Sequence, residues 1–201
     1  MTVILGATVL SLVAGVGSLP AAGGGPLEQL QQSMDEVLGI LQDEELKSPE
    51  RKEERRKRVI LVVNEMFDFR EMARSSLGQS WNSLSPAEQE KFVGLFTSLV
   101  EERYIGKIDS YTDQKVVYTK ELVKGDRAMI YTSIVDKDLD IPIVYRLQKE
   151  NGRWLAVDLK IENVSLVVNY RRDFDVIMRK EKFAGLVEKI SSQLEKTQTS
   201  N

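Results

Sequence analysis

Carboxylates are the side chains of this sequence with the widest range of possible chemistry, because its 201 residues include no histidine and no cysteine. The chain therefore cannot form a disulfide, a thiolate nucleophile, a Ser-His-Asp triad or a zinc site built on cysteine or histidine. Catalysis would have to use carboxylates, lysine, tyrosine or a carboxylate-bound metal. This composition argues against catalysis, and we expect no enzymatic activity.

Two groups of carboxylates are worth considering. Asp158 lies in the alternating stretch WLAVDLKI, so it is the best candidate for a buried carboxylate. Pairing with an arginine or a tyrosine is the favoured interpretation, and an enzyme that acts through Asp158 is the alternative. Asp136, Asp138 and Asp140 alternate in one turn, but the glycine and distal glutamate of an EF-hand loop are missing. We therefore predict no metal site.

A run of charge, ERKEERRKR, covers residues 50–58. Such runs are usually a solvated helix face with ion pairs three and four residues apart, for example Glu54 with Arg58. The alternative is a docking strip for an acidic partner or anionic lipid headgroups, formed by Arg55, Arg56 and Arg58. The net charge of the whole chain is −3, which does not indicate a nucleic-acid partner.

These side chains would be positioned by a helical part at about 26–110. Apolar residues recur three and four apart from Leu27 to Leu41, which predicts a helix with one apolar stripe. Gly78 is expected to end a later helix. Ser85, Pro86 and Glu88 form a capping box with proline at the first helical position, which predicts the start of another.

The pattern then changes to alternation, which predicts an antiparallel meander at about 111–168. The expected strands are 115–123, 128–135, 141–148 and 153–161, and a final helix is expected at about 173–194. Residues 1–25 are apolar, uncharged and rich in small residues, so we predict a signal peptide, with an uncleaved membrane anchor as the alternative. Residues 26–201 are expected to form one domain.

Three stretches resemble the MlaC family of periplasmic phospholipid-binding proteins, also called toluene-tolerance auxiliary components. They are FDFREMARSSLGQSW at 67–81, LSPAEQEKF at 84–92 and WLAVDLKIENVSLVVNYRRDF at 154–174. Three positions differ from the family pattern. Asn163 replaces a glycine, and Arg172 with Asp173 replaces smaller or neutral residues.

The resemblance implies an α+β fold: a strongly curved antiparallel sheet of about four to five strands, of the cystatin or nuclear-transport-factor type, wrapped by helices. It also implies a periplasmic carrier that shuttles phospholipid between an outer-membrane lipoprotein complex and an inner-membrane ABC transporter complex with an MCE-type substrate-binding subunit. The phospholipid would be cargo, no cofactor is expected, and a monomer is the default. A periplasmic adaptor that docks a membrane transport complex without binding lipid is the alternative.

For the carrier, the resemblance implies acyl chains held between sheet and helices, with Tyr170 and Arg171 near the headgroup. The residues that we expect in the acyl pocket are Phe69, Leu77, Phe92, Phe96, Leu99, Ile130, Ile134, Ile143, Tyr145, Val164, Leu166 and Val168. For any one of them, the alternative is an ordinary place in a filled core.

Overall fold

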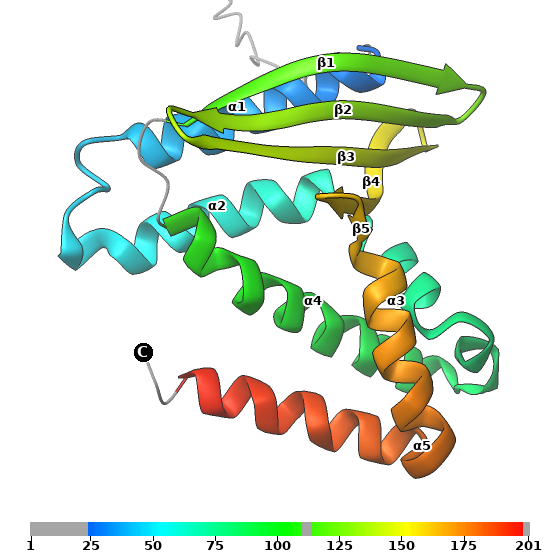
Figure 1. The fold of residues 1–201 in the computed structure, drawn as a ribbon. Coiled ribbons are helices and arrows are strands. Elements are labelled where there is room, and N and C mark those ends of the chain that lie inside the picture. Colours follow the sequence, from blue (N-terminus) through cyan, green and yellow to red (C-terminus); the bar gives the residue numbers. More distant parts are fainter. Residues whose placement is uncertain (1–23, 110–113, 199–201) are drawn as a thin grey trace, which may run out of the picture.

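An antiparallel sheet forms the upper layer of the molecule, and helices α2 to α5 lie beneath it (Figure 1). The computed structural model describes residues 24–109 and 114–198, so nearly all of the predicted signal peptide lies outside the described residues. Within the described ranges, no helix is both long and apolar enough to cross a bilayer.

The elements follow one another with helices first, then strands, then a long helix. In chain order they are α1 (Pro26–Gln42), the 3₁₀ helix η1 (Pro49–Arg51), α2 (Lys52–Met66), α3 (Phe69–Leu77), the 3₁₀ helix η2 (Gly78–Ser83), α4 (Pro86–Asp109), β1 (Lys115–Lys124), β2 (Arg127–Asp136), β3 (Leu139–Glu150), β4 (Arg153–Ile161), β5 (Val164–Ser165) and α5 (Leu166–Gln198).

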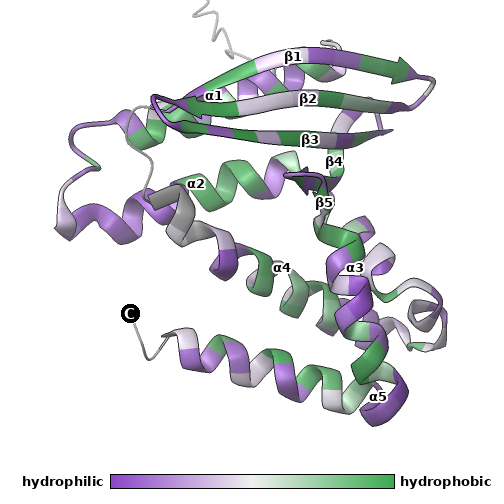
Figure 2. Ribbon diagram, in the orientation of Figure 1, coloured by the Kyte–Doolittle hydropathy of each residue, from purple (hydrophilic) through white to green (hydrophobic). Residues whose placement is uncertain are grey.

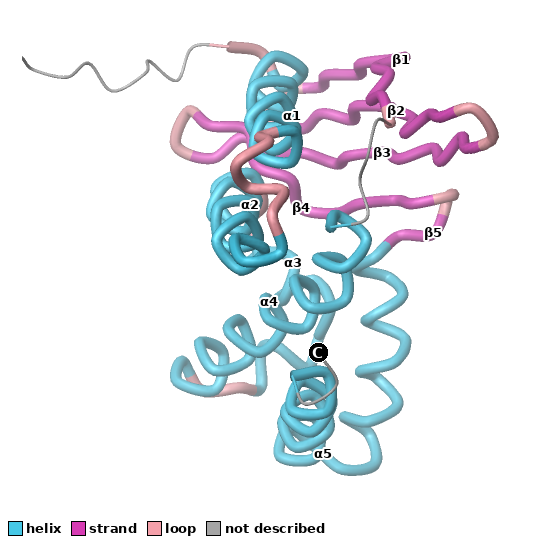
Figure 3. The backbone as a smooth tube through the Cα atoms, turned by 90° about the vertical axis from the view of Figure 1, so that its left-hand side faces the viewer, coloured by secondary structure: helices cyan, strands magenta, loops and turns pink. Residues whose placement is uncertain are grey.

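The sheet is a meander with the strand order β1-β2-β3-β4-β5, and every pairing is antiparallel. The expected α+β class and strands are thus confirmed. Burial alternates along β2 and β4, as a sheet with one covered face requires. Register shifts between Tyr118 and Lys120, and between Arg146 and Leu147, mark bulges that increase the local twist. Helix α1 lies against the sheet (Figure 3). The Gln29 side chain of α1 accepts a hydrogen bond from the Trp154 backbone of β4.

The helix starts and stops follow local chemistry. The capping box forms as predicted: the Glu88 carboxylate accepts from the Ser85 backbone and hydroxyl (both 2.8 Å), and the Ser85 hydroxyl accepts from the Glu88 backbone. Gly78 ends α3 at φ 57°, a conformation that glycine adopts without a steric penalty.

Helix α5 begins at Leu166, earlier than the expected start near Asp173, so the apolar run 164–168 is mostly helix and not strand. Two bonds explain the early start. The Ser165 hydroxyl accepts from the Val168 backbone (3.1 Å), and the Asp158 carboxylate accepts from the Val167 backbone (3.1 Å). Oxygen acceptors at this point satisfy free N–H groups of the first helical turn.

Helix α5 also changes direction at Lys182, whose backbone (φ 61°, ψ −167°) is not helical. After this turn its second half runs back beneath α4 (Figure 1). The helix expected at about 173–194 is therefore bent in its middle.

The buried side chains form three separate clusters. A helical cluster joins α3, α4 and α5 through packed aromatic rings, including Phe92 against Phe174 with ring centres 5.6 Å apart. A sheet cluster joins α1 to β2, β3 and β4. A small third cluster, formed by Val37, Leu41, Val59 and Val62, joins α1 to α2.

We expect Asp158→Asn to destabilise the fold. Asp158 is 2% exposed, and its carboxylate accepts from the Ser165 hydroxyl (2.7 Å), the Val167 backbone and Arg146 (3.4 Å). An amide cannot accept all three bonds, so the free energy of unfolding in urea should fall by about 1–3 kcal/mol. Asp138→Asn, in the exposed β2–β3 turn, is the control and should change it by less than about 0.5 kcal/mol. Equal stability of the two variants would contradict this role for Asp158.

The capping box should make stability depend on pH. The hydrogen bonds from Ser85 lower the pKa of Glu88 in the folded protein, so the carboxylate stabilises the fold above its unfolded pKa of about 4.3 and loses this effect as pH falls through the folded pKa. Glu88→Gln should therefore be less stable than the wild type at pH 7, and the difference should shrink below pH ~4. Urea unfolding at several pH values measures it. The Ser85→Ala variant should abolish most of the difference, because the two residues share one set of bonds.

Candidate functional site

A cavity of about 470 Å³ lies between the sheet and helices α1, α2 and α4, where the three buried clusters meet. Its lining takes Val37 and Val59 from the third cluster, Ile143 from the sheet cluster, and Met72 and Val100 from the helical cluster. Cavities of about 300–1,000 Å³ are the usual size for small-molecule sites. The interior is thus left unfilled at the place where the layers join.

The lining is almost wholly apolar. Its residues come from helices α1 to α5, from strands β1 to β4 and from the segments next to them, namely Met34, Val37, Leu38, Leu41, Val59, Ile60, Val63, Met66, Phe67, Phe69, Met72, Val100, Glu101, Tyr104, Gln114, Val116, Ile134, Leu139, Ile141, Ile143, Tyr145, Leu159, Ile161 and Leu166. Such a lining binds hydrocarbon and offers few hydrogen bonds.

Five of the residues expected in an acyl pocket line this cavity. They are Phe69, Ile134, Ile143, Tyr145 and Leu166. Ile134 and Ile143 come from neighbouring strands, and the side chain of Tyr145 is buried with its hydroxyl 3.8 Å from the Met34 sulfur. Burial raises the pKa of Tyr145, so its ring is a neutral part of the wall.

The other seven do not line it. Leu77, Phe92, Phe96 and Leu99 are packed in the helical cluster, and Ile130 is packed in the sheet cluster. Val164 and Val168 are 60% and 56% exposed. The last two point away from the interior because the chain turns into a capped helix at Ser165, which replaces the alternation of a strand with helical periodicity.

The two residues expected at a headgroup also lie elsewhere. The Tyr170 ring packs on Phe96 and Phe174, with ring centres 5.4 Å away in each case, and burial raises the pKa of its hydroxyl. The Arg171 guanidinium donates to the Ser75 carbonyl, with Nε at 2.8 Å. Arg171 thereby ties α5 to the end of α3, and neither residue belongs to the cavity lining.

The charge run begins in η1 and continues through the amino-terminal half of α2. That half of α2 is hydrophilic, whereas the half that lines the cavity is hydrophobic (Figure 2). Arg58 donates to Glu54 (2.5 Å), and Arg56 donates to Glu53 (3.3 Å). These pairs, three and four residues apart, are those expected of a solvated helix face. Arg55 is half-buried on the same helix.

The part that α1 plays in the cavity was not predicted. The sequence indicated an apolar stripe from Leu27 to Leu41, but not that four of its residues (Met34, Val37, Leu38 and Leu41) would line the cavity. The sheet positions Ile141, Leu159 and Ile161 were missed as well. A signal existed for Ile141, because it alternates with Ile143 and Tyr145 and so shares their face.

The apolar lining is interrupted by a few polar groups. Glu101 and Tyr104 on α4 and Gln114 before β1 also line the cavity. Glu101 is half-buried, and this burial raises the pKa of its carboxyl, while a hydrogen bond with the Asn64 side chain acts in the opposite direction.

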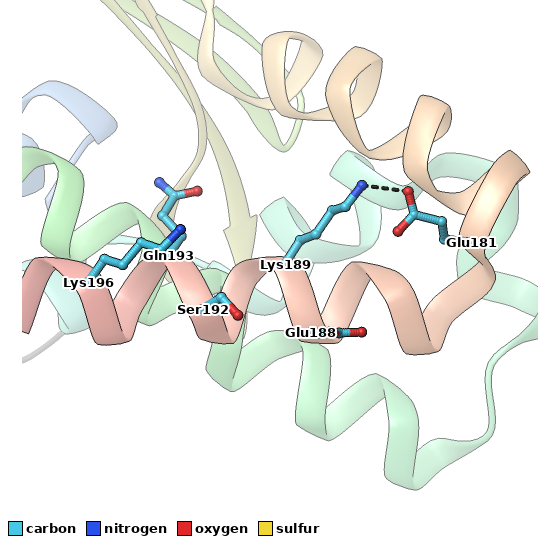
Figure 4. A pocket seen from close by; sticks show the side chains of 6 residues that line it. All are labelled: Glu181, Glu188, Lys189, Ser192, Gln193 and Lys196. Atoms are coloured by element: carbon cyan, nitrogen blue, oxygen red, sulfur yellow. Dashed lines mark hydrogen bonds and ion pairs between the residues drawn. The ribbon is translucent and has the colours of Figure 1, made fainter.

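A second hollow of about 440 Å³ runs along the second half of α5 (Figure 4). Its walls are polar, and Lys189 donates across it to Glu181 (2.5 Å). No group of three or more carboxylates in the described ranges is arranged to hold a metal ion, and this includes Asp136, Asp138 and Asp140. The apolar cavity is therefore the candidate site.

Comparison with known proteins agrees with this geometry. A family model described as "MlaC protein" matches residues 31–192. An intermembrane phospholipid transport system binding protein, MlaC of Haemophilus influenzae, is 25% identical over 174 residues, which cover 82% of this chain and 80% of that protein. A phospholipid-binding protein from Ralstonia solanacearum, solved in complex with a phospholipid, has a similar fold. It gives a TM-score of 0.75 at 21% identity and covers 87% of this chain and 99% of its own. Because the family model spans most of the sequence, this chain belongs to the MlaC family.

Proposed function

We propose that this protein is a carrier that holds a phospholipid with its acyl chains in the cavity between sheet and helices. The observation that supports the proposal most directly is the apolar lining of a cavity of about 470 Å³ at the junction of three cores. The phospholipid bound to the Ralstonia protein of similar fold, and the transport role in the name of the Haemophilus relative, support the same ligand class.

The physical need for such a carrier is large. Exposing an acyl chain of about 16 carbons to water costs roughly 11 kcal/mol, at about 0.8 kcal/mol for each methylene group. A lipid that leaves a bilayer without a carrier meets most of this cost. A dry apolar cavity removes it, so transfer needs no chemical step and no catalytic residue.

The setting that we propose is the periplasm. The carrier would exchange lipid with an inner-membrane ABC transporter complex, through an MCE-type subunit, and with an outer-membrane lipoprotein complex. The phospholipid is cargo, and the protein acts as a monomer without a cofactor.

We expect purified protein to carry about one phospholipid, and Ile134→Trp to lower that occupancy. Ile134 lines the cavity, so an indole there takes up space that an acyl chain would use. Native mass spectrometry without detergent, followed by lipid extraction, measures the bound fraction. Val117→Trp is the control, because Val117 is 42% exposed on the other face of the neighbouring strand.

Three results separate the possibilities. Lipid in the wild type and in Val117→Trp, with less in a folded Ile134→Trp, supports the cavity as the lipid site. Equal lipid in all three proteins places the ligand elsewhere. A bare protein mass, unchanged after incubation with vesicles, would end the carrier proposal and leave the adaptor that binds no lipid.

Charge reversal on α2 should separate carriage from docking. Changing Arg55, Arg56 and Arg58 to glutamate leaves the cavity lining intact, so the lipid content should stay the same. If α2 docks a membrane complex, delivery of labelled lipid to the reconstituted inner-membrane complex should fall severalfold. Unchanged delivery would mean that the run is only a solvated face. Loss of the bound lipid as well would contradict the separation of the two roles.

A further inference from the structure

Helices α1 and α2 cover only one face of the sheet. Leu30 of α1 and Met66 of α2 pack with Ile130 and Tyr145 in the sheet cluster, on the side of the cavity. Figure 1 shows α1 behind strands β1 and β2, so the side of these strands that faces the viewer is the other one. We call this other side the outer face.

The pairing register identifies the side chains of the outer face, because directly opposite residues of antiparallel strands point to the same side. Ile130 is buried on the inner face, so its neighbours Met129 and Tyr131 point outward. The Lys120 ammonium lies 5.7 Å from the centre of the Tyr131 ring, which places it on the same side. Three adjacent rows of the outer face are Lys124, Arg127, Gln148 and Leu155; Leu122, Met129, Arg146 and Asp158; and Lys120, Tyr131, Val144 and Lys160.

These three rows are strongly cationic. Five of their twelve positions are lysine or arginine, and the one carboxylate, Asp158, is 2% exposed and paired with Arg146 (3.4 Å). Five cations and one carboxylate give the rows a net charge of +4, whereas the whole chain carries −3. Asp140 and Glu150 lie near the two ends of β3, outside the rows. Positive potential is therefore concentrated on one side of an acidic protein.

Apolar side chains lie between the cations. Leu122 is 44% exposed, and Met129 and Val144 are half-buried in the same rows. Lysine and arginine side chains can lie with their stems along such apolar groups while their charged ends reach phosphates. A protein partner would need carboxylates at fixed positions opposite these cations, whereas a fluid layer of anionic headgroups can match them in any register. This composition therefore favours a membrane surface over an acidic protein.

We propose that the outer face binds the surface of a membrane that contains anionic phospholipids, with Lys120, Lys124 and Arg127 as its main contacts. The cavity lies on the other side of the sheet, so this binding does not require lipid in the cavity. The interaction adds to the proposed carrier function a means of keeping the protein close to a bilayer.

Flotation with vesicles tests the proposal. Purified protein is mixed with vesicles of equimolar phosphatidylglycerol and phosphatidylcholine, or of phosphatidylcholine alone, and a density gradient measures the protein that moves with the vesicles. At low salt we expect at least about tenfold stronger binding to the anionic vesicles, because each cation near such a surface adds to the attraction. Raising the salt to about 0.5 M should remove most of the binding, because it screens the charges.

Charge reversal assigns the binding to the outer face. The triple variant Lys120→Glu, Lys124→Glu, Arg127→Glu should bind anionic vesicles at least about tenfold more weakly than the wild type. Glutamine at the same three positions should give a smaller loss in the same direction. This milder variant keeps the test decisive if the reversal unfolds the protein, which circular dichroism checks.

The matched control is the triple variant Lys91→Glu, Arg179→Glu, Lys180→Glu. These three residues are exposed on α4 and α5, and the substitutions change the net charge by the same amount. The control should keep most of the binding to anionic vesicles, because it leaves the outer face unchanged.

The outcomes are distinct. No binding at low salt, equal binding to both kinds of vesicle, or an equal loss in both charge reversals overturns the proposal. If the wild type binds no vesicle but reversal on the outer face lowers lipid delivery to the reconstituted inner-membrane complex, the face docks an acidic protein and the proposal is wrong. Binding to anionic vesicles by a protein that carries no phospholipid would support the outer face and overturn only the carrier.

Discussion

One buried carboxylate determines how the two layers of this protein meet. Asp158 lies on β4 and binds groups from three other elements: Arg146 of β3, Ser165 of β5 and the Val167 backbone of α5. A charge taken out of water is stable only while such partners stay in place. Helix α5 is therefore held at a fixed point where it leaves the sheet, and the space between sheet and helices depends on that point.

Much of the fold could be predicted because its signals are local. Alternation along β2 and β4, the capping box at Ser85 and the glycine at position 78 each involve neighbouring residues. Asp158 was recognised as a buried carboxylate for the same reason. Its partners Ser165 and Val167 were not predicted, because hydrogen bonds between a strand and the start of the following helix are visible only in the tertiary structure. The start of α5 was consequently placed too late.

The cavity was harder to predict because periodicity shows that a helix face is buried but not what covers it. Phe69 and Phe92 look equivalent in sequence, yet Phe69 lines the cavity while Phe92 is surrounded by rings of α4 and α5. No sequence pattern distinguishes Glu101 from the other glutamates of α4. Its environment comes from α2 and the sheet, which are distant in the sequence.

The backward turn of α5 at Lys182 has a consequence for the order in which the chain can fold. The helical cluster contains Phe69 and Phe92 from early in the chain, but Leu186 and Ile190, which complete it, come from beyond the turn. Contacts between residues so far apart in sequence form slowly, because a long loop has to close first. Until the last segment is available, the large rings of α4 stay exposed, and exposed apolar surface of this kind favours aggregation. A chain that ended before this turn would lack Leu186 and Ile190 and would leave that side of the helical cluster uncovered.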